Sequence, residues 1–201
     1  MRSKGTLALV AVVLVLGFVG CGATSSYNSL VQSQEQVNTA WANLQSQYQR
    51  RADLIPNLVS TVKGAADFEQ ETLTQVTEAR ASATSIQIDA GDLDDPQKIQ
   101  QFQQAQSQLG QALGRLLAVS ENYPQLQATQ SFRDLQAQLE GTENRIAVAR
   151  RDYNRAAQQY NTSIRSFPTV IVAGMMGFDR REPFEAEAGA QDAPDVDFSD
   201  N

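Results

Sequence analysis

Few residues in this chain could do chemistry. The sequence has one cysteine, Cys21, and no histidine, whereas hydrolytic and metal sites usually use these residue types. Carboxylates remain as candidates, and Glu140, Glu143 and Asp152 lie along one predicted helix. They could form an acid and base pair, but neighbouring arginines favour ion pairs over catalysis. We therefore expect no enzymatic activity, catalytic residue, metal, cofactor or small-molecule substrate.

One of these carboxylates has a specific predicted partner. Arg51 falls on the apolar face of its helix between Tyr48 and Ile55, where a buried cation without a carboxylate partner costs several kcal/mol. Glu143 lies beside the apolar stripe of a second predicted helix, at residues 132–167. If the two helices run antiparallel, the two side chains can meet. We predict a structural ion pair between Arg51 and Glu143 that fixes the register of the helices.

Cys21 is a predicted lipidation site. It directly follows the apolar run Thr6–Gly20, which begins after Arg2 and Lys4, and this is the layout of a secretory signal peptide. The end of the run resembles a bacterial lipobox, although Phe18 stands where that pattern usually has leucine. The predicted product is a lipoprotein that is cleaved before Cys21 and carries lipid, such as palmitate, at its new N-terminus.

An uncleaved transmembrane helix is the alternative. The fifteen residues of the run, at 1.5 Å each, span about 23 Å of a hydrocarbon core of about 30 Å, and an extension through Ala23 nearly closes that gap. In both cases the basic N-terminus stays inside. We expect a protein of the cell membrane or outer membrane, lipid-anchored or single-pass, with its body outside the cytoplasm.

The body of the chain has the pattern of packed helices. Apolar residues recur every three or four positions over residues 132–167, 27–88 and 99–123, as in a helical bundle or coiled coil. Pro56 interrupts the first stretch, and a proline removes one helical hydrogen bond, so we expect a kink there. Trp41 is expected in the core. The predicted fold is all-α: an antiparallel bundle of three long helices, the first kinked into two segments, on an N-terminal membrane anchor.

Two local patterns are interpreted as structural. The aspartates of residues 89–95 lack the spacing of an EF-hand calcium loop, whereas Asp95 before Pro96 predicts the N-cap and first residue of a helix. Gly110 and Gly114 form a small-residue pair on the helix that follows, and they predict a close approach of two helices inside the bundle.

The predicted organisation has five parts. They are a signal peptide or anchor at 1–20, a spacer at 21–26, the bundle at 27–168, an apolar arm packed on the bundle at 169–184, and an acidic disordered tail at 185–201. The arm is expected to be extended, with an exposed partner-binding strip as the alternative. The seven acids after Arg181 equal the whole net charge of −7. Without a basic surplus to displace counterions, we expect no nucleic-acid partner.

Several motifs, spread in order over residues 27–184, resemble the LemA family of bacterial membrane-associated proteins. They are Tyr27–Val31, Ala40-Trp41, Arg50–Val59, Val62–Gly64, Glu121–Pro124, Leu139–Ile146, Ala149–Asn154, Tyr160-Asn161, Phe167-Pro168 and Gly177-Phe178. The resemblance implies an antiparallel helical bundle on an N-terminal membrane anchor without an established enzymatic activity. Members linked to magnetosome biogenesis indicate a role in membrane organisation. The chain departs from the family pattern at Ala65 and Phe68, where relatives commonly have tyrosine and histidine.

These features predict a noncatalytic, membrane-anchored scaffold of the cell envelope that organises membrane or binds envelope proteins. Its partners would be membrane lipid, through the N-terminal anchor, and another protein or further copies of itself. A carboxylate-based envelope hydrolase and a sensory or adaptor module are the alternatives. Three or more carboxylates clustered in a concave pocket would favour the hydrolase.

Overall fold

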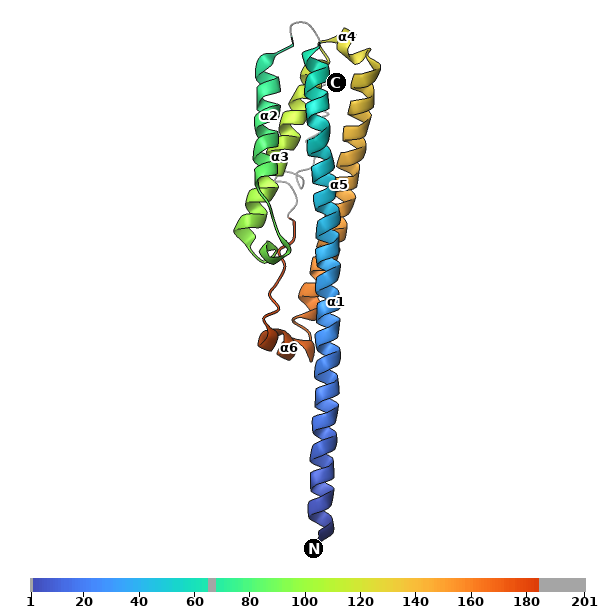
Figure 1. Ribbon diagram of the computed structural model, residues 1–201, viewed down its shortest axis with the longest axis vertical. Coiled ribbons are helices and arrows are strands. Elements are labelled where there is room, and N and C mark those ends of the chain that lie inside the picture. The colour runs from blue at the N-terminus through green and yellow to red at the C-terminus, as the bar shows by residue number, and fades with distance from the viewer. Residues whose placement is uncertain (1, 65–67, 185–201) are drawn as a thin grey trace, which may run out of the picture.

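The protein is an elongated helical rod. The computed structural model describes residues 2–64 and 68–184, and within residues 2–21 it describes the side chains of Leu9 and Leu14 only. Six α-helices and no strand occur in these ranges, which confirms the all-α fold. Figure 1 shows the bundle at one end of the rod and the N-terminal part of the first helix projecting beyond it. The predicted disordered tail, Ala65 and the Cys21 thiol lie outside the described residues and side chains.

Helix α1 (Arg2–Lys63) runs the length of the rod and continues through Pro56. The chain leaves this helix after Lys63 and enters α2 (Gln70–Ser85), so the single kinked helix predicted over 27–88 is wrong. The predicted spacer at 21–26 also belongs to α1. The periodicity misled here because α1 and α2 bury their apolar faces in one core, so the pattern continues across the break between them.

Pro56 does not end α1 because another side chain supplies the missing donor. A residue at position 56 would normally donate its N–H to the carbonyl of Ala52, one turn back, and proline cannot. In the structure the Nε of Arg80, on α2, donates to the Ala52 carbonyl at 2.8 Å. The buried carbonyl is thereby satisfied from a neighbouring helix.

Four further helices complete the fold. They are α3 (Pro96–Ser120), α4 (Pro124–Gln127), α5 (Gln130–Ser163) and α6 (Thr169–Met176), and a 3₁₀ turn at Ala90–Asp92 precedes α3. The prediction for the start of α3 is confirmed, because Pro96 is its first residue and Asp95 is its N-cap. The Asp95 side chain accepts hydrogen bonds from the N–H groups of Gln97 and Lys98, at 2.9 and 3.2 Å. Four of the six helices are long, not the three that were predicted.

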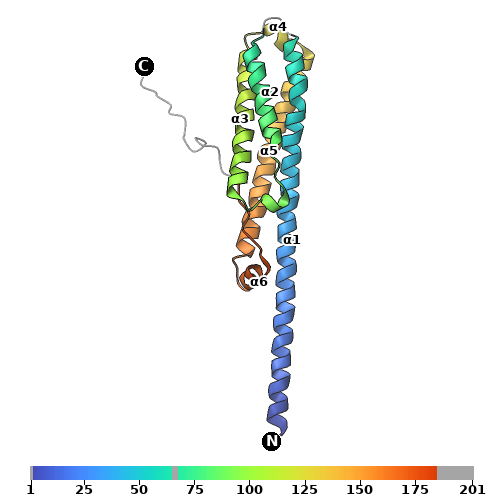
Figure 2. The same cartoon turned by 60° about the vertical axis from the view of Figure 1, so that its left-hand side comes forward.

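The long helices pack in antiparallel pairs. Trp41 contacts Tyr153 and Arg51 contacts Glu143, so the numbering rises along α1 as it falls along α5. The Gln106 amide donates to the Ala83 carbonyl, which places α2 beside α3. Figures 1 and 2 show α1 and α5 side by side, with the α2 and α3 pair covering the half of the bundle farthest from the N-terminus.

The core has two clusters along the rod, one around Trp41, Phe102 and Tyr153 and one around Leu58, Leu109 and Phe132. The prediction that Trp41 is buried is confirmed, since only 3% of its surface is exposed. Its Nε1–H donates to the Ile88 carbonyl at 3.2 Å. The tryptophan therefore joins α1 to the loop between α2 and α3.

The segment after α5 differs from the extended arm that was predicted. Its first half forms α6, and residues 178–184 then run back along the bundle as a non-helical segment. Asn161 holds Arg181 through two hydrogen bonds between its side-chain amide and the Arg181 backbone, at 2.8 and 2.9 Å. Asn154 holds the Phe184 backbone in the same way, at 2.9 and 2.8 Å. We call residues 178–184 the C-terminal strap.

Candidate functional site

A buried polar cluster lies where α1, α3 and α5 meet. The structure brings Arg51 and Glu143 together, with Arg51 Nη1 2.6 Å from Glu143 Oε1. The other terminal nitrogen of Arg51 donates to the Gln106 side-chain oxygen at 2.6 Å and to the Gln106 carbonyl at 3.1 Å. The guanidinium also lies over the Tyr48 ring, 5.3 Å from its centroid. Gln106 is a partner that the sequence analysis missed, because a glutamine in a glutamine-rich helix gives no distinguishing signal.

The two partners of the ion pair differ in their contact with water. The Arg51 side chain is 4% exposed and the Glu143 side chain is 48% exposed. Within the described residues, Arg51 Nε is a buried nitrogen without a hydrogen-bond partner. The cluster therefore holds a buried cation that depends on one partly solvated carboxylate and on neutral oxygens.

Gly110 and Gly114 lie beside this cluster but do not bring two helices into contact. A Cβ added at Gly110 would lie 4.0 Å from Arg51 Nη1, and a Cβ at Gly114 would have nothing within 4 Å. Both glycines line a cavity of about 390 Å³ between α3 and α5, together with Glu140 and Glu143. The predicted close approach at this pair is wrong, because small residues at this position leave open space.

The candidate carboxylates do not converge on a common catalytic position. Glu140 and Glu143 share the cavity between α3 and α5, and Glu143 is held by Arg51. Asp152 lies in a separate groove and pairs loosely with Arg155, at 3.7 Å. Among the described residues, no group of three or more histidine, cysteine or acidic side chains could hold a metal ion. Neither of these two cavities contains the three carboxylates that would favour a hydrolase.

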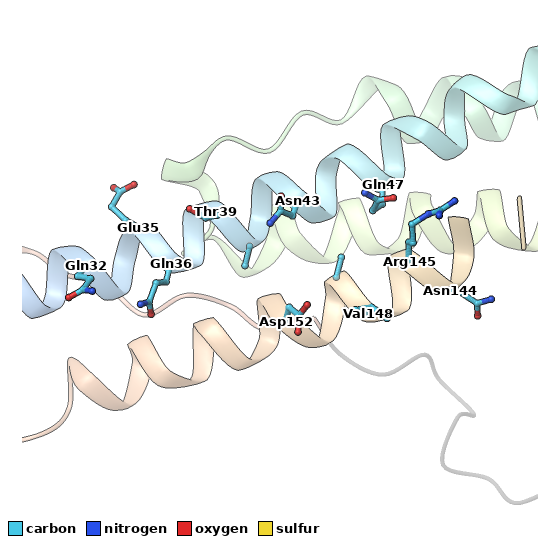
Figure 3. A pocket seen from close by; sticks show the side chains of 12 residues that line it. Gln32, Glu35, Gln36, Thr39, Asn43, Gln47, Asn144, Arg145, Val148 and Asp152 are labelled. Atoms are coloured by element: carbon cyan, nitrogen blue, oxygen red, sulfur yellow. The ribbon is translucent and has the colours of Figure 1, made fainter. Parts of the chain in front are cut away.

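The groove that contains Asp152 runs between α1 and α5. Figure 3 shows polar side chains of α1, including Gln36, Asn43 and Gln47, facing Arg145 and Asp152 of α5 across it. The groove has a volume of about 710 Å³, and the exposed Val148 forms part of its wall. Its two acids, Glu35 and Asp152, have neither a histidine nor a cysteine beside them. The groove offers amide and carboxylate groups for binding but no activated nucleophile.

A third feature is an exposed apolar surface on α6 and the turn before it. It consists of Phe167, Val170, Ile171, Met175 and Met176, which are 41 to 82% exposed. We call these five side chains the α6 surface. Figures 1 and 2 both place α6 at the end of the bundle from which the N-terminal part of α1 projects. The sequence analysis noted an apolar stretch here but predicted an extended arm instead of a helix.

The strap closes the aromatic core just beyond α6. The Phe184 ring stacks against Trp41 and meets the Tyr153 ring edge-on, with centroids 5.9 and 5.4 Å apart. The Tyr153 hydroxyl donates to the Glu182 carbonyl at 2.8 Å, and burial raises the pKa of this hydroxyl. Asn154 and Asn161, seven residues apart on one face of α5, were a signal for this contact that the sequence analysis did not use.

The predicted N-terminal site is only partly described. The backbone at Cys21 is helical within α1, and nothing is described of its thiol. In the part of the chain that the structure describes, none of the helices combines the length and the apolar character needed to cross a membrane. At the two departures from the family pattern, Ala65 is not described, and the Phe68 ring packs on Tyr123 with centroids 4.9 Å apart.

Comparison with known proteins identifies relatives over nearly the whole chain. Magnetosome protein MamQ 2 of Paramagnetospirillum magneticum is 31% identical over an alignment that covers 95% of this chain and 76% of the relative. Magnetosome protein MamQ of Magnetospirillum gryphiswaldense is 29% identical with the same coverage. Protein LemA of Metamycoplasma hominis is 26% identical over 80% of this chain and 69% of the relative.

The family model agrees with these relatives and with the motifs in the sequence. The model that describes the LemA family matches residues 40–198, which include α2, α3, α5, α6 and most of the bundle part of α1. The match covers well over half of the chain and includes Trp41, Arg51, Glu143 and both asparagines of the strap contact. The all-helical fold is the one that the motif resemblance implied. This chain therefore belongs to the LemA family.

Proposed function

We propose that this protein is a noncatalytic scaffold, anchored in a membrane at its N-terminus, which organises that membrane or binds envelope proteins outside the cytoplasm. The observation that carries the proposal is the continuity of α1. The helix that contains the apolar run Thr6–Gly20 continues without a break into the bundle and ends at Lys63. Leu9 and Leu14, the described side chains of this run, are 66% and 67% exposed. In the uncleaved form an anchor in this run would be rigidly joined to the bundle, and in the cleaved form the helix would lead from a lipid at Cys21 directly into the bundle.

The noncatalytic part of the proposal is supported by the chemistry of the chain. The sequence has no histidine, and the carboxylates of the described cavities are either paired with arginine or lie apart from one another. The names of the MamQ relatives refer to the magnetosome, which supports a role in membrane organisation over hydrolysis. The groove between α1 and α5 is the surface that we propose for an envelope protein partner.

Two forms of the anchor fit the sequence. In the favoured form the chain is cut before Cys21 and the thiol carries lipid, because the apolar run ends directly at this cysteine. In the alternative form residues 6–20 and their extension remain as a membrane helix. Both forms attach α1 to the membrane just before the N-terminal end of the bundle.

Membrane fractionation of the full chain, with mass spectrometry of its N-terminus, tests the proposal. We expect the wild type to stay in the membrane after an alkaline carbonate wash and to begin at a lipid-modified Cys21. An intact Met1 with an unmodified thiol in the washed membrane would replace the lipid anchor by a membrane helix. The Leu9→Arg/Leu14→Arg variant disrupts both forms and should be lost from the membrane. A wild-type protein that the wash releases would overturn the proposal.

A further inference from the structure

The exposed large apolar side chains of this protein gather at one end of the rod. Nine of them are exposed among the residues whose side chains are described: the five of the α6 surface, Leu9, Leu14, Tyr27 and Val148. All except Val148 lie on α6 and its preceding turn or on the first part of α1. Soluble proteins rarely expose a contiguous apolar patch of this kind without a partner for it. This end of the rod is therefore a candidate binding surface for an apolar partner.

Charge is absent from the patch and returns at its borders. Residues 167–178 contain no charged side chain, whereas Arg165 precedes them and Asp179 and Arg180 follow. Arg165 and Arg180 come from opposite sides of α6 in the sequence and line one polar cavity of about 680 Å³. An uncharged apolar helix with arginines directly before and after it in the sequence fits a helix that lies in the interface of a membrane, where cations meet phosphate headgroups.

The position of α6 along α1 identifies the partner. The Tyr27 and Phe178 rings meet edge-on, with centroids 5.8 Å apart, which fixes the strap directly after α6 beside the start of the bundle. Tyr27 is four residues from Ala23, where the extended membrane helix would end, and six residues from Cys21, so it lies about 6 Å and about 9 Å along the helix from the two proposed anchor points. The polar interface of a bilayer adds about 5 to 8 Å on each side of the hydrocarbon core. The membrane-helix form thus holds α6 at the depth of the membrane interface, and the lipid-anchored form holds it at the outer edge of that interface.

We infer that the α6 surface docks into the interface of the membrane in which the chain is anchored. Phe167, Ile171, Met175 and Met176 enter the boundary between headgroups and acyl chains, and Arg165 and Arg180 contact lipid phosphates. The inference rests on the proposed function, because the anchor brings α6 to the membrane. It adds a second contact point beside α1, which fixes the orientation of the rod relative to the membrane surface.

A second copy of this chain is the competing occupant of the α6 surface. Two copies that paired through α6 would hide the apolar side chains without a membrane. The membrane is favoured because the Tyr27–Phe178 contact places α6 at the N-terminal end of the bundle, which is the end of α1 that both forms of the anchor attach to the membrane. A dimer through α6 would not require the patch to lie at the anchored end of the rod.

Fluorescence quenching in vesicles tests the inference on the full, anchored chain. A Met175→Trp variant is reconstituted into vesicles of neutral and anionic phospholipids brominated near the headgroup end of the acyl chains. The new tryptophan should be strongly quenched, with an emission maximum at shorter wavelength. The native Trp41, buried inside the bundle, should not be quenched in the wild type. Val148→Trp is the matched control, since it also replaces an exposed apolar residue but lies midway along the rod.

The outcomes separate this inference from the proposed function. If the chain floats with the vesicles but the tryptophan at position 175 is not quenched, the inference is overturned and the anchor remains. If that tryptophan shifts to shorter wavelength without quenching and the protein crosslinks as a dimer, a second copy covers the α6 surface and the inference is also overturned. Equal quenching at position 148 would mean that the rod lies flat on the membrane, which contradicts the orientation. A chain that does not float at all would contradict the proposed function itself.

A charged variant supplies an independent measurement. Ile171→Asp/Met175→Asp places two acids on exposed positions, so the melting temperature of the bundle should stay that of the wild type. The variant should still float with the vesicles through its anchor. A tryptophan introduced at Phe167 in this background should lose the quenching that it shows in an otherwise wild-type chain. Retained quenching would overturn the inference.

Discussion

Arg80 of α2 donates its Nε–H to the Ala52 carbonyl of α1, at 2.8 Å, and thereby replaces the hydrogen bond that Pro56 cannot make. Ala52 is 3% exposed, so water has little access to its carbonyl. A buried carbonyl without a donor costs about 1 to 3 kcal/mol. The contact explains why α1 continues through a proline, and it fixes the position of Arg80 on α2 beside Ala52 on α1.

A mutant cycle on Arg80 and Pro56 measures this replacement. Arg80→Met should destabilise the bundle by about 1 to 3 kcal/mol, because the Ala52 carbonyl loses its donor. In a Pro56→Ala background the alanine N–H can serve that carbonyl, so the same change should cost clearly less. Urea unfolding of the two single variants and the double variant gives the coupling energy. Additive losses would mean that Arg80 does not compensate for the proline.

The loss of either Arg51 or Glu143 should destabilise the bundle. Glu143→Gln leaves the buried Arg51 charge with neutral oxygens only, and we expect a loss of about 2 kcal/mol, below the 3 to 5 kcal/mol of a fully buried pair because Glu143 is 48% exposed. Arg51→Met leaves a carboxylate that water can solvate, but it also removes the donor of two buried Gln106 oxygens, so we expect a loss of about 1 to 3 kcal/mol.

The double variant is the control for this pair. Once Arg51 is methionine, Glu143→Gln should cost almost nothing further, because no buried charge remains to be stranded. Thermal and urea unfolding of the three variants measure the coupling between the two residues. Strictly additive losses would contradict the proposed role of the pair, and normal folding with impaired membrane organisation would move both residues into a binding surface.

Trp41 should be among the most sensitive positions in the core. Trp41→Ala removes a buried ring that contacts Phe102, Tyr153 and Phe184, and we expect a loss of about 3 to 5 kcal/mol. Trp41→Phe keeps most of the apolar volume but leaves the Ile88 carbonyl without its donor, so a loss of about 1 to 3 kcal/mol is expected. Differential scanning calorimetry compares the two. A Trp41→Ala variant that melts like the wild type would contradict the burial.

The sequence predicted those features that depend on local pattern. The spacing of apolar residues indicated helices, Asp95 before Pro96 indicated a helix start, and the position of Arg51 on an apolar face indicated a buried cation. Each of these depends on a few neighbouring residues. The same reasoning did not find partners that are distant in sequence: Arg80 donates to the Ala52 carbonyl one turn before Pro56, and Gln106 shares a cation assigned to Glu143 alone.

The apolar surface on α6 shows a second limit of sequence patterns. Periodicity can indicate that a stretch has an apolar face, but it does not distinguish a face that is packed from one that is exposed. Ala173 is buried against the bundle while Met175 is 78% exposed, although both belong to the same short helix. Only the position of α6 at the end of the bundle decides which side chains remain uncovered.

The C-terminal strap should depend on its two asparagines. Asn161→Ala removes both hydrogen bonds to the Arg181 backbone, and we expect residues 178–184 to leave the bundle more often. Arg181 is 7% exposed, so trypsin should cut after it slowly in the wild type and faster in the variant. Asn57→Ala, at an exposed position of α1 next to Leu58 of the other core cluster, is the control. Equal cleavage rates in all three proteins would mean that the Asn161 hydrogen bonds do not hold the strap.

Two buried tyrosines should make the bundle sensitive to alkali. Burial raises the pKa of Tyr153 and of Tyr160 above the ordinary value of 10.0, and the nearby Arg181 only partly opposes this. Because the unfolded chain loses these protons first, the folded state binds more protons above pH 10. The free energy of unfolding is therefore little affected by these two groups below pH 10. Above pH 10 it falls, by about 1.4 kcal/mol per pH unit for each tyrosine that stays neutral in the folded protein.

Urea unfolding at a series of pH values tests whether stability falls above pH 10 and whether Tyr153 contributes to that fall. The free energy of unfolding should change little from about pH 8 to 9.5 through these groups and then fall, because tyrosine in an unfolded chain titrates near pH 10. Tyr153→Phe should be less stable at neutral pH, since the hydroxyl no longer donates to the Glu182 carbonyl, but its alkaline fall should be shallower. An equal slope in Tyr153→Phe and the wild type would show that Tyr153 ionises as easily in the folded protein as in the unfolded chain.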